Sequence, residues 1–352
     1  MTATTPLGVG ILGAGPVTQA IHLPTLARLA DLFTVTTIMD VNPDVAASVA
    51  ARVNARPVTS MEELLADPNV DVVAICSPPQ FHAAQVIAAM DAGKKAVLCE
   101  KPFATTPAEA EQIAAASLRT GVPVLVGAMH VFDPGWQAVA DEVQRIAATT
   151  HTVRSRIIIP FNDRFEDAAT EVVARPDLQL GGGEMTAAAV TAMFTNAILG
   201  LAVHDLPLVR TFLPDAGDIT IHTAQLLQPF GYLIEGSAGD RNVHLVAGIA
   251  GHWEAYWELE AITPDETLTI RFTPSYVQAG SAVATLRPVD GPSITWGPYE
   301  ANGYENEWRS LHAVVSGDTT AAPSQQTLIE DLTFILAVAE RSAARATEEF
   351  AS

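Results

Sequence analysis

Strand and helix signals alternate along the first third of this 352-residue chain. Helical apolar spacing fills the stretches between the apolar runs, as in Gln80–Ala92 and Pro107–Thr120. Strands that alternate with helices predict βαβ units and a parallel, doubly wound sheet. The runs that predict buried strands are Leu7–Leu12, Phe33–Met39, Val70–Cys76, Ala96–Cys99 and Val122–Val126.

Beyond about residue 128 the pattern changes, and strand signals follow one another with few helices between them. Two helical stretches, Met185–Leu201 and Leu206–Leu213, interrupt these strands, and Thr327–Ala346 reads as an amphipathic helix. Consecutive strands with segregated helices indicate an α+β domain. We therefore predict an α/β chain of two domains, residues 1–127 and 128–352. The predicted strands are Thr152–Pro160, Asp218–Leu227, Tyr232–Glu235, Asn242–Ile249, Trp253–Ile262 and Glu266–Phe272.

A short glycine motif, Gly13-Ala14-Gly15, lies between the first predicted strand and the following helix. Glycines at this point let backbone N–H groups approach a pyrophosphate at the helix N-terminus, where Pro16 and Val17 begin the helix. The usual third glycine is replaced by Thr18. The motif predicts a dinucleotide site on a Rossmann domain.

Asp40 closes the second predicted strand and strengthens this interpretation. An acidic residue there accepts hydrogen bonds from both ribose hydroxyls and repels a 2′-phosphate. The next residues, Val41, Asn42 and Pro43, supply no arginine. The sequence therefore predicts NAD rather than NADP; the alternative for Asp40 is a turn or helix-cap residue.

Two further loops follow predicted strands, where the carboxyl ends of parallel strands line the ligand crevice. The first holds Ser77, Pro78 and His82, and the second holds Glu100 and Lys101. We predict that these residues bind the cofactor. Lys101 is also placed to hold an ammonium near a substrate hydroxyl, although a lone lysine of this kind is also typical of a protein surface.

Three segments, GAGPVTQAIHLPTL, AICSPPQFHAAQVIAAMDAGK and VLCEKPFATT, resemble the glucose–fructose oxidoreductase, inositol dehydrogenase and MocA family. Weaker matches follow in VGAMHVFDP and AVHDLPLVRTFL. The resemblance implies a Rossmann domain followed by a domain with a large, open, mostly antiparallel sheet. It also implies a homodimer or homotetramer, because members commonly pair through that sheet.

The resemblance assigns Lys101 and His204 as the catalytic residues of a sugar or polyol dehydrogenase. Lys101 would contact cofactor and substrate, and His204 would carry a proton, which suits an imidazole. His130 and Asp205 complete the predicted substrate site. Two residues depart from the family pattern: Gly200 replaces an aspartate, and Val131 replaces an arginine. Asp205 is then a candidate for fixing the His204 tautomer.

Two alternative functions stay open. A glycosidase could use NAD for transient oxidation, elimination, hydration and re-reduction, with His130 or Glu184 as the extra base. Arg154, Arg156 and Arg164 could then hold an anionic sugar, although solvated strand-edge charges are the plainer interpretation. A regulator that binds NAD without catalysis is the third possibility, and the retained Lys101 and His204 argue against it.

Composition restricts the partners of the chain. Forty acidic residues against 19 basic ones give a net charge of −21, which disfavours nucleic acid and anionic membranes as partners. Hydrophobic residues make up 49% of the chain and charged residues only 17%, which favours an oligomer. The histidines lack metal-ligand spacing, so no metal is expected. No targeting signal or apolar run of membrane-span length is evident, so we expect a cytoplasmic protein.

Overall fold

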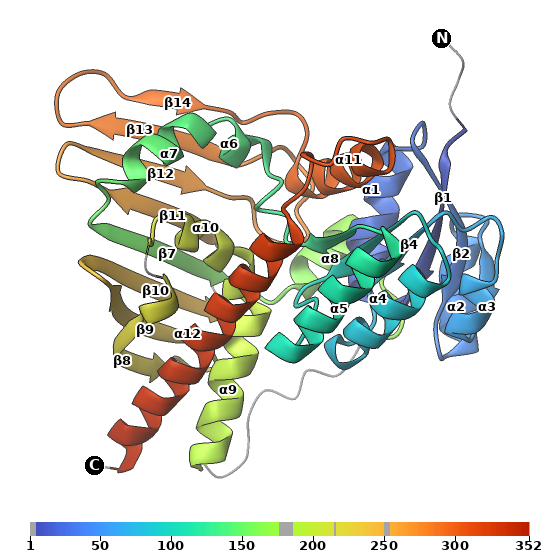
Figure 1. The fold of residues 1–352 in the computed structure, drawn as a ribbon, viewed down its shortest axis with the longest axis horizontal. Helices are drawn as coiled ribbons and strands as arrows, with labels where there is room; N and C mark the ends of the chain where they lie inside the picture. The colour runs from blue at the N-terminus through green and yellow to red at the C-terminus, as the bar shows by residue number, and fades with distance from the viewer. Residues whose placement is uncertain (1–4, 176–185, 215, 250–253, 352) are drawn as a thin grey trace. The chain divides into compact units, whose positions relative to one another are not determined.

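The computed structural model describes residues 5–175, 186–214, 216–249 and 254–351. The described chain forms two compact units (Figure 1). The first comprises residues up to 128, residues 165–175 and residues 304–329, and the second contains the remaining described residues. Segments on either side of residue 128 therefore contribute to the first unit. No helix among the described residues is both long enough and apolar enough to cross a membrane.

The first unit contains a six-stranded parallel sheet in the order β3-β2-β1-β4-β5-β6. Five strands lie where apolar runs predicted them. No apolar run predicted β3, because this short edge strand exposes two of its three residues. The strands are β1 (Leu7–Leu12), β2 (Phe33–Met39), β3 (Arg56–Val58), β4 (Val72–Ile75), β5 (Ala96–Glu100) and β6 (Val124–Gly127).

The helices of the first unit begin at residues suited to capping. Asn42 and Ser60 accept hydrogen bonds from the first-turn amides of α2 and α3, and Thr106 forms a capping box with Glu109 at the start of α5. Gly121 ends α5 with φ +73°, a left-handed conformation that favours glycine. The helices are α1 (Leu23–Arg28), α2 (Pro43–Ala51), α3 (Met61–Leu65), α4 (His82–Asp91), α5 (Pro107–Thr120) and most of α8 (Asp163–Ala169) and α11 (Gly303–Val315).

The second unit is built on an eight-stranded sheet in the order β14-β13-β12-β11-β7-β10-β9-β8. All neighbours are antiparallel except β7 and β10, which pair in parallel. The fold class predicted from the sequence is thus confirmed, although β13 and β14 were not anticipated. The strands are β7 (Thr152–Ile159), β8 (Thr220–Leu226), β9 (Phe230–Ala238), β10 (Arg241–Ile249), β11 (Tyr256–Ile262), β12 (Glu266–Arg271), β13 (Val283–Pro288) and β14 (Ile294–Trp296).

The two faces of this sheet differ in character. Along β7, Val153, Ser155 and Ile157 are buried, whereas Arg154 and Arg156 alternate with them and are exposed. Helices α6, α9 and α10 contact the sheet. One face therefore forms the core, and the other carries charged side chains. The helices of this unit are α6 (Pro134–Gln137), α7 (Ala140–Ala147), α9 (Ala187–Gly200), α10 (Leu206–Thr211) and most of α12 (Gln325–Ala351).

Candidate active site

The turn after β1 has the shape that a bound dinucleotide requires. Gly13 has φ +94°, and a Cβ there would lie 2.7 Å from the carbonyl oxygen of Cys76. A Cβ on Gly15 would meet nothing within 4 Å, so the space beside this residue is open. Thr18, in place of a third glycine, donates a hydrogen bond to the Gly13 carbonyl at 2.6 Å. These features fit a pyrophosphate held by backbone N–H groups at the start of the helix, where Val17 has an N–H and Pro16, which has none, begins the first turn.

Asp40 lies directly beyond β2, beside the glycine turn. Its carboxylate accepts one hydrogen bond from the backbone N–H of Ala14 and one from that of Asn42, each at 2.9 Å. Each carboxylate oxygen retains a second acceptor position, which suits a ribose diol. Val41 follows with 82% of its surface exposed, and Phe81, in the segment after β4, is 50% exposed. The sequence reasoning missed these two apolar residues, whose signal is an apolar side chain in an otherwise polar loop.

His82 joins the two remaining loops of the predicted cofactor site. Its Nδ1 lies 2.8 Å from the carbonyl oxygen of Pro102, and its Nε2 lies 2.7 Å from that of Ser77. Because both partners are acceptors, the two hydrogen bonds form together only when both ring nitrogens carry protons. Ser77 also donates to Gln85 at 2.5 Å, while Pro78 is exposed. His82 therefore positions the loops and is itself buried.

Lys101 follows β5 and is partly buried, and the Lys101–Pro102 peptide bond is cis. Burial lowers the pKa of the Lys101 ammonium, and the nearby charge of Glu100 opposes that shift. The backbone N–H of Lys101 donates to Glu100 Oε2 at 3.2 Å. A lysine of reduced pKa at the end of a parallel strand is suited to handling the proton of a bound hydroxyl.

Glu100 belongs to an internal cluster that sequence reasoning did not find. Its Oε1 accepts a hydrogen bond from His22 Nε2 at 3.0 Å, and the Nε1 of Trp308 donates to His22 Nδ1 at 3.1 Å. Glu307 is 1% exposed, and neither of its carboxyl oxygens has a hydrogen-bond partner among the described residues. Burial raises the pKa of Glu307 well above its ordinary value, and the charge of Glu100 adds to this shift. The motif around Glu100 gave no sign of partners from so distant a segment.

In the second unit, Asp205 is the centre of a buried polar network. Its Oδ1 accepts hydrogen bonds from Trp257 Nε1 at 2.7 Å and from His130 Nδ1 at 2.9 Å, and its Oδ2 accepts from Ser155 Oγ at 2.6 Å. Asp205 is 1% exposed and His130 is 2% exposed. The predicted substrate residues His130 and Asp205 are therefore direct partners, whereas Ser155 and Trp257 were not predicted.

His204 lies beside this network. Its ring centroid is 5.8 Å from that of His130 and 5.6 Å from that of Trp257. Gly200, which takes the place of the expected aspartate, is the last residue of α9, and a Cβ there would meet nothing within 4 Å. Glu184, the other candidate base, lies outside the described residues. The sequence suggested that Asp205 fixes the tautomer of His204. In the structure Asp205 accepts a hydrogen bond from His130, a partner that sequence reasoning did not anticipate.

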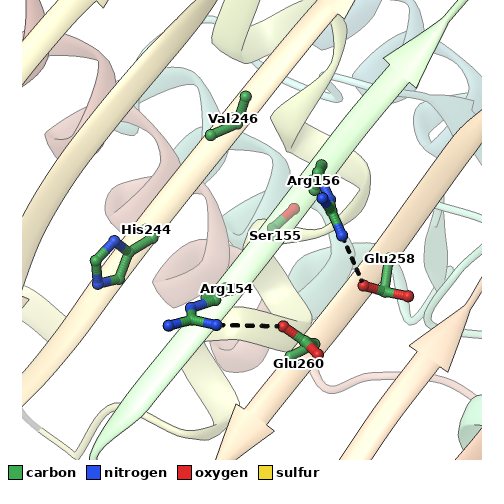
Figure 2. Close-up of a pocket in the computed structure, with 7 residues that line it drawn as sticks. All are labelled: Arg154, Ser155, Arg156, His244, Val246, Glu258 and Glu260. Carbon is green, nitrogen blue, oxygen red and sulfur yellow. Dashed lines mark hydrogen bonds and ion pairs between the residues drawn. The ribbon is translucent and has the colours of Figure 1, made fainter.

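The open face of the eight-stranded sheet carries a shallow hollow (Figure 2). Arg156 pairs with Glu258 at 3.2 Å, and Arg154 pairs with Glu260 at 3.7 Å, in each case across β7 and β11. Arg271, from β12, also pairs with Glu258 at 3.0 Å. Arg154 and Arg156, two of the three arginines considered for an anionic sugar, are therefore balanced by carboxylates from the neighbouring strand. Arg164 lies on α8, away from this row. Both arginines are exposed, but β7 lies between β11 and β10 in the sheet, so they are not the strand-edge charges of the plainer interpretation.

Comparison with known proteins agrees with the geometry of the first unit. Residues 7–128 match the family described as "Oxidoreductase family, NAD-binding Rossmann fold", GFO_IDH_MocA. Residues 7–128 belong to this family. This assignment confirms the resemblance carried by the glycine turn and the Lys101 segment.

Curated relatives match part of the chain. An inositol 2-dehydrogenase from Acidothermus cellulolyticus is 35% identical over 57% of the chain and 62% of the relative. An inositol 2-dehydrogenase/D-chiro-inositol 3-dehydrogenase from Shouchella clausii is 37% identical over 36% of the chain and 37% of the relative. The chain thus spans less than two thirds of the length of these relatives.

Solved structures share the fold over nearly the whole chain. The 3-ketoreductase KijD10 from Actinomadura kijaniata, in complex with TDP-benzene and NADP, has a TM-score of 0.70 and 21% identity, and the match covers 95% of this chain and 96% of that one. A putative oxidoreductase, yvaA from Bacillus subtilis, has a TM-score of 0.68 and 18% identity, with coverage of 96% and 98%. At this identity the likeness concerns the fold.

Proposed function

We propose that this protein is an NAD-dependent oxidoreductase that transfers hydride between nicotinamide and a secondary hydroxyl of a sugar, polyol or sugar derivative. One observation supports this proposal most directly. The glycine turn and Lys101 both lie at the carboxyl ends of strands of the same parallel sheet. The glycine turn follows β1, and Lys101 follows β5. Ligands of such sheets bind outside the carboxyl ends of the strands.

NAD, rather than NADP, is the cofactor that Asp40 favours. Its carboxylate repels a 2′-phosphate and presents acceptors to a free ribose diol. KijD10 is described with NADP, so the fold alone accommodates either cofactor. The choice in this chain therefore depends on the residues after β2, where Val41 and Asn42 offer no cation.

Lys101 and His204 are the residues that we propose to act on the substrate hydroxyl. The bound nicotinamide would supply or accept the hydride. The Lys101 ammonium lowers the pKa of the hydroxyl by its charge, and His204 takes the proton or returns it. Carbohydrate substrates are supported by the inositol dehydrogenases and the 3-ketoreductase among the similar proteins.

One assay with two readouts tests this function. Purified protein is incubated with substoichiometric NAD and a mixed panel of sugars, polyols and aryl glycosides, while NADH and released aglycone are followed together. NADH that rises toward the amount of NAD, without aglycone, is expected. Aglycone released in large excess over NAD, with little NADH, would instead indicate the redox-neutral glycosidase. If neither product forms although NAD binds, the non-catalytic NAD-binding regulator becomes the better interpretation.

We also propose that the chain forms a homodimer, or a homotetramer containing that dimer, through the open face of the eight-stranded sheet. Arginines of β7 lie beside glutamates of β11 (Figure 2). A second copy related by a two-fold axis would place arginine rows against glutamate rows, as a self-complementary interface requires. Light scattering should give at least twice the chain mass, and a double change of Arg154 and Arg156 to Glu should give the monomer mass.

A further inference from the structure

We infer that Asp205 and His130 form a positioning pair that orients His204 and balances its charge when it carries the substrate proton. This inference rests on the proposed function and assigns work to two residues beyond Lys101 and His204. It concerns only the second unit, where the three residues lie together.

The hydrogen bonds fix the state of the His130 ring. Asp205 Oδ1 accepts from His130 Nδ1 at 2.9 Å, so Nδ1 carries a proton. In the neutral ring, Nε2 is then an acceptor. Nε2 is buried and has no hydrogen-bond partner among the described residues. A buried polar atom left without a partner destabilises the folded protein, so its retention points to a use.

Packing holds the ring in place. The His130 ring stacks on Phe272, with centroids 3.9 Å apart and planes 16° from parallel. The edge of Trp257 lies across it at 4.7 Å, and the same indole donates to Asp205. Stacked, T-shaped and hydrogen-bonded contacts leave the ring little freedom to rotate. His130 is therefore preorganised in the manner expected of a group that supports catalysis.

His204 is the group through which the pair would act. Its ring centroid lies 5.8 Å from that of His130, with the planes tilted by 51°. Because Nε2 of His130 is closed to solvent, substrate does not reach it directly in this structure. Gly200, four residues before His204, supplies no carboxylate from its own helix. Asp205 is the buried carboxylate that the fold places nearby, and His130 is its direct partner.

The charge balance of the step is simple. Oxidation of a secondary hydroxyl breaks its O–H and C–H bonds; the hydride goes to the oxidised nicotinamide and the proton to the imidazole of His204. The resulting imidazolium is stabilised by the negative charge of Asp205, transmitted through the dipole of His130. Carbonyl reduction reverses each of these transfers.

Two further titratable groups, Tyr232 and Asp133, interact with the network and can contribute to its pH dependence. Burial raises the pKa of Tyr232, and the charge of Asp205 raises it further. Burial also raises the pKa of Asp133, while hydrogen bonds from Ala282 and Gly135 and the nearby His130 oppose that shift. The variants Tyr232→Phe and Asp133→Asn show how much each of these two groups contributes to a pH-dependent change.

The first test measures the kinetics of four variants. They are Asp205→Asn, His130→Asn, His204→Asn and the double variant of the two histidines. The control is His151→Asn, because His151 is exposed and lies directly before β7. We expect kcat to fall about 10²–10⁴-fold in His204→Asn and about 10–100-fold in His130→Asn and Asp205→Asn, with KM little changed. The double variant should be no slower than His204→Asn, because residues that act as a unit are not additive. Multiplying losses would overturn the inference.

Nitrogen-15 NMR of the histidine rings tests the pair without turnover, so it remains decisive if no substrate is converted. We expect His130 as the Nδ1–H tautomer in the unmodified protein. The titration midpoint of His204 should fall in Asp205→Asn, because a negative charge that favours the imidazolium is lost. Ser155→Ala, which removes only one of the hydrogen bonds to Asp205, should give a smaller fall and guards against misfolding. An Nε2–H tautomer, or an unmoved His204 midpoint in both variants, would contradict the proposal.

Discussion

The indole Nε1 of Trp308 donates a hydrogen bond to Nδ1 of His22 across 3.1 Å, and the two residues are 286 positions apart in the chain. Because an indole N–H is only a donor, this contact requires an unprotonated Nδ1. The proton of the neutral ring then lies on Nε2, which donates to Glu100 at 3.0 Å. Glu100 accepts in turn from the backbone of Lys101. Helix α11 thus helps to hold the loop that carries the proposed catalytic lysine.

Replacing Trp308 with Phe should destabilise the first unit. The change leaves Nδ1 of a fully buried His22 without its donor and removes part of a side chain that is 0% exposed. An unsatisfied buried acceptor costs about 1–3 kcal/mol. Urea unfolding should show a loss of this size, against a change within about 0.5 kcal/mol for Trp296→Phe on the half-exposed edge strand β14. A change within about 0.5 kcal/mol in Trp308→Phe as well would show that the hydrogen bond to His22 does not stabilise the first unit.

The buried carboxyl of Glu307 should make stability fall as pH rises. Burial raises its pKa well above the ordinary value, so between about pH 4.3 and the folded-state pKa the folded protein holds a proton that the unfolded chain has lost. Each pH unit in this window costs about 1.4 kcal/mol. Glu307→Gln keeps the neutral shape and removes this dependence. Its Tm should therefore exceed that of the parent near pH 8 and match it near pH 4.5; a constant difference across this range would disprove the buried proton.

Local sequence patterns predicted the strands of the parallel sheet and the motifs at their carboxyl ends, because strand periodicity and glycine turns depend on neighbouring residues. The predicted cofactor loops around Gly13, Asp40 and His82 follow the strands that the sequence indicated. The partners of Glu100 and Asp205 could not be predicted in this way. His22, which Trp308 holds, reaches Glu100 from another part of the chain, as Trp257 reaches Asp205. A single sequence carries no signal for such pairings. Asp205 itself was predicted as part of the substrate site, but as a partner of the His204 ring and not of the His130 ring.

Asp40 should control the choice between NAD and NADP. Asp40→Ser removes the charge that repels a 2′-phosphate, and Val41→Arg adds a cation beside it. The double variant should shift the ratio of kcat/KM for NAD over that for NADP by about 10²-fold or more toward NADP, since about 1.4 kcal/mol corresponds to each factor of ten. Asp44→Ser, at an exposed position on α2, is the matched control and should leave the ratio unchanged. An unchanged ratio in the double variant would remove Asp40 from cofactor selection.

The segment that carries His130 should depend on a close backbone contact at Gly135. Asp133 accepts hydrogen bonds from Gly135 N at 2.7 Å and from Ala282 N at 3.0 Å, which fastens α6 to the chain before β13. A Cβ on Gly135 would lie 2.3 Å from the carbonyl oxygen of Ala282, so the backbone would have to move.

Gly135→Ala should therefore lower the free energy of unfolding by about 1–3 kcal/mol, the usual cost of overpacking, and should also displace the His130 ring from Phe272. Gly217→Ala is the control, because a Cβ there meets nothing within 4 Å. Denaturant unfolding gives the stability, and the chemical shifts of the His130 ring, which lies against Phe272, report the displacement. If Gly135→Ala is as stable as Gly217→Ala and leaves these shifts unmoved, the contact at Ala282 does not set the position of His130.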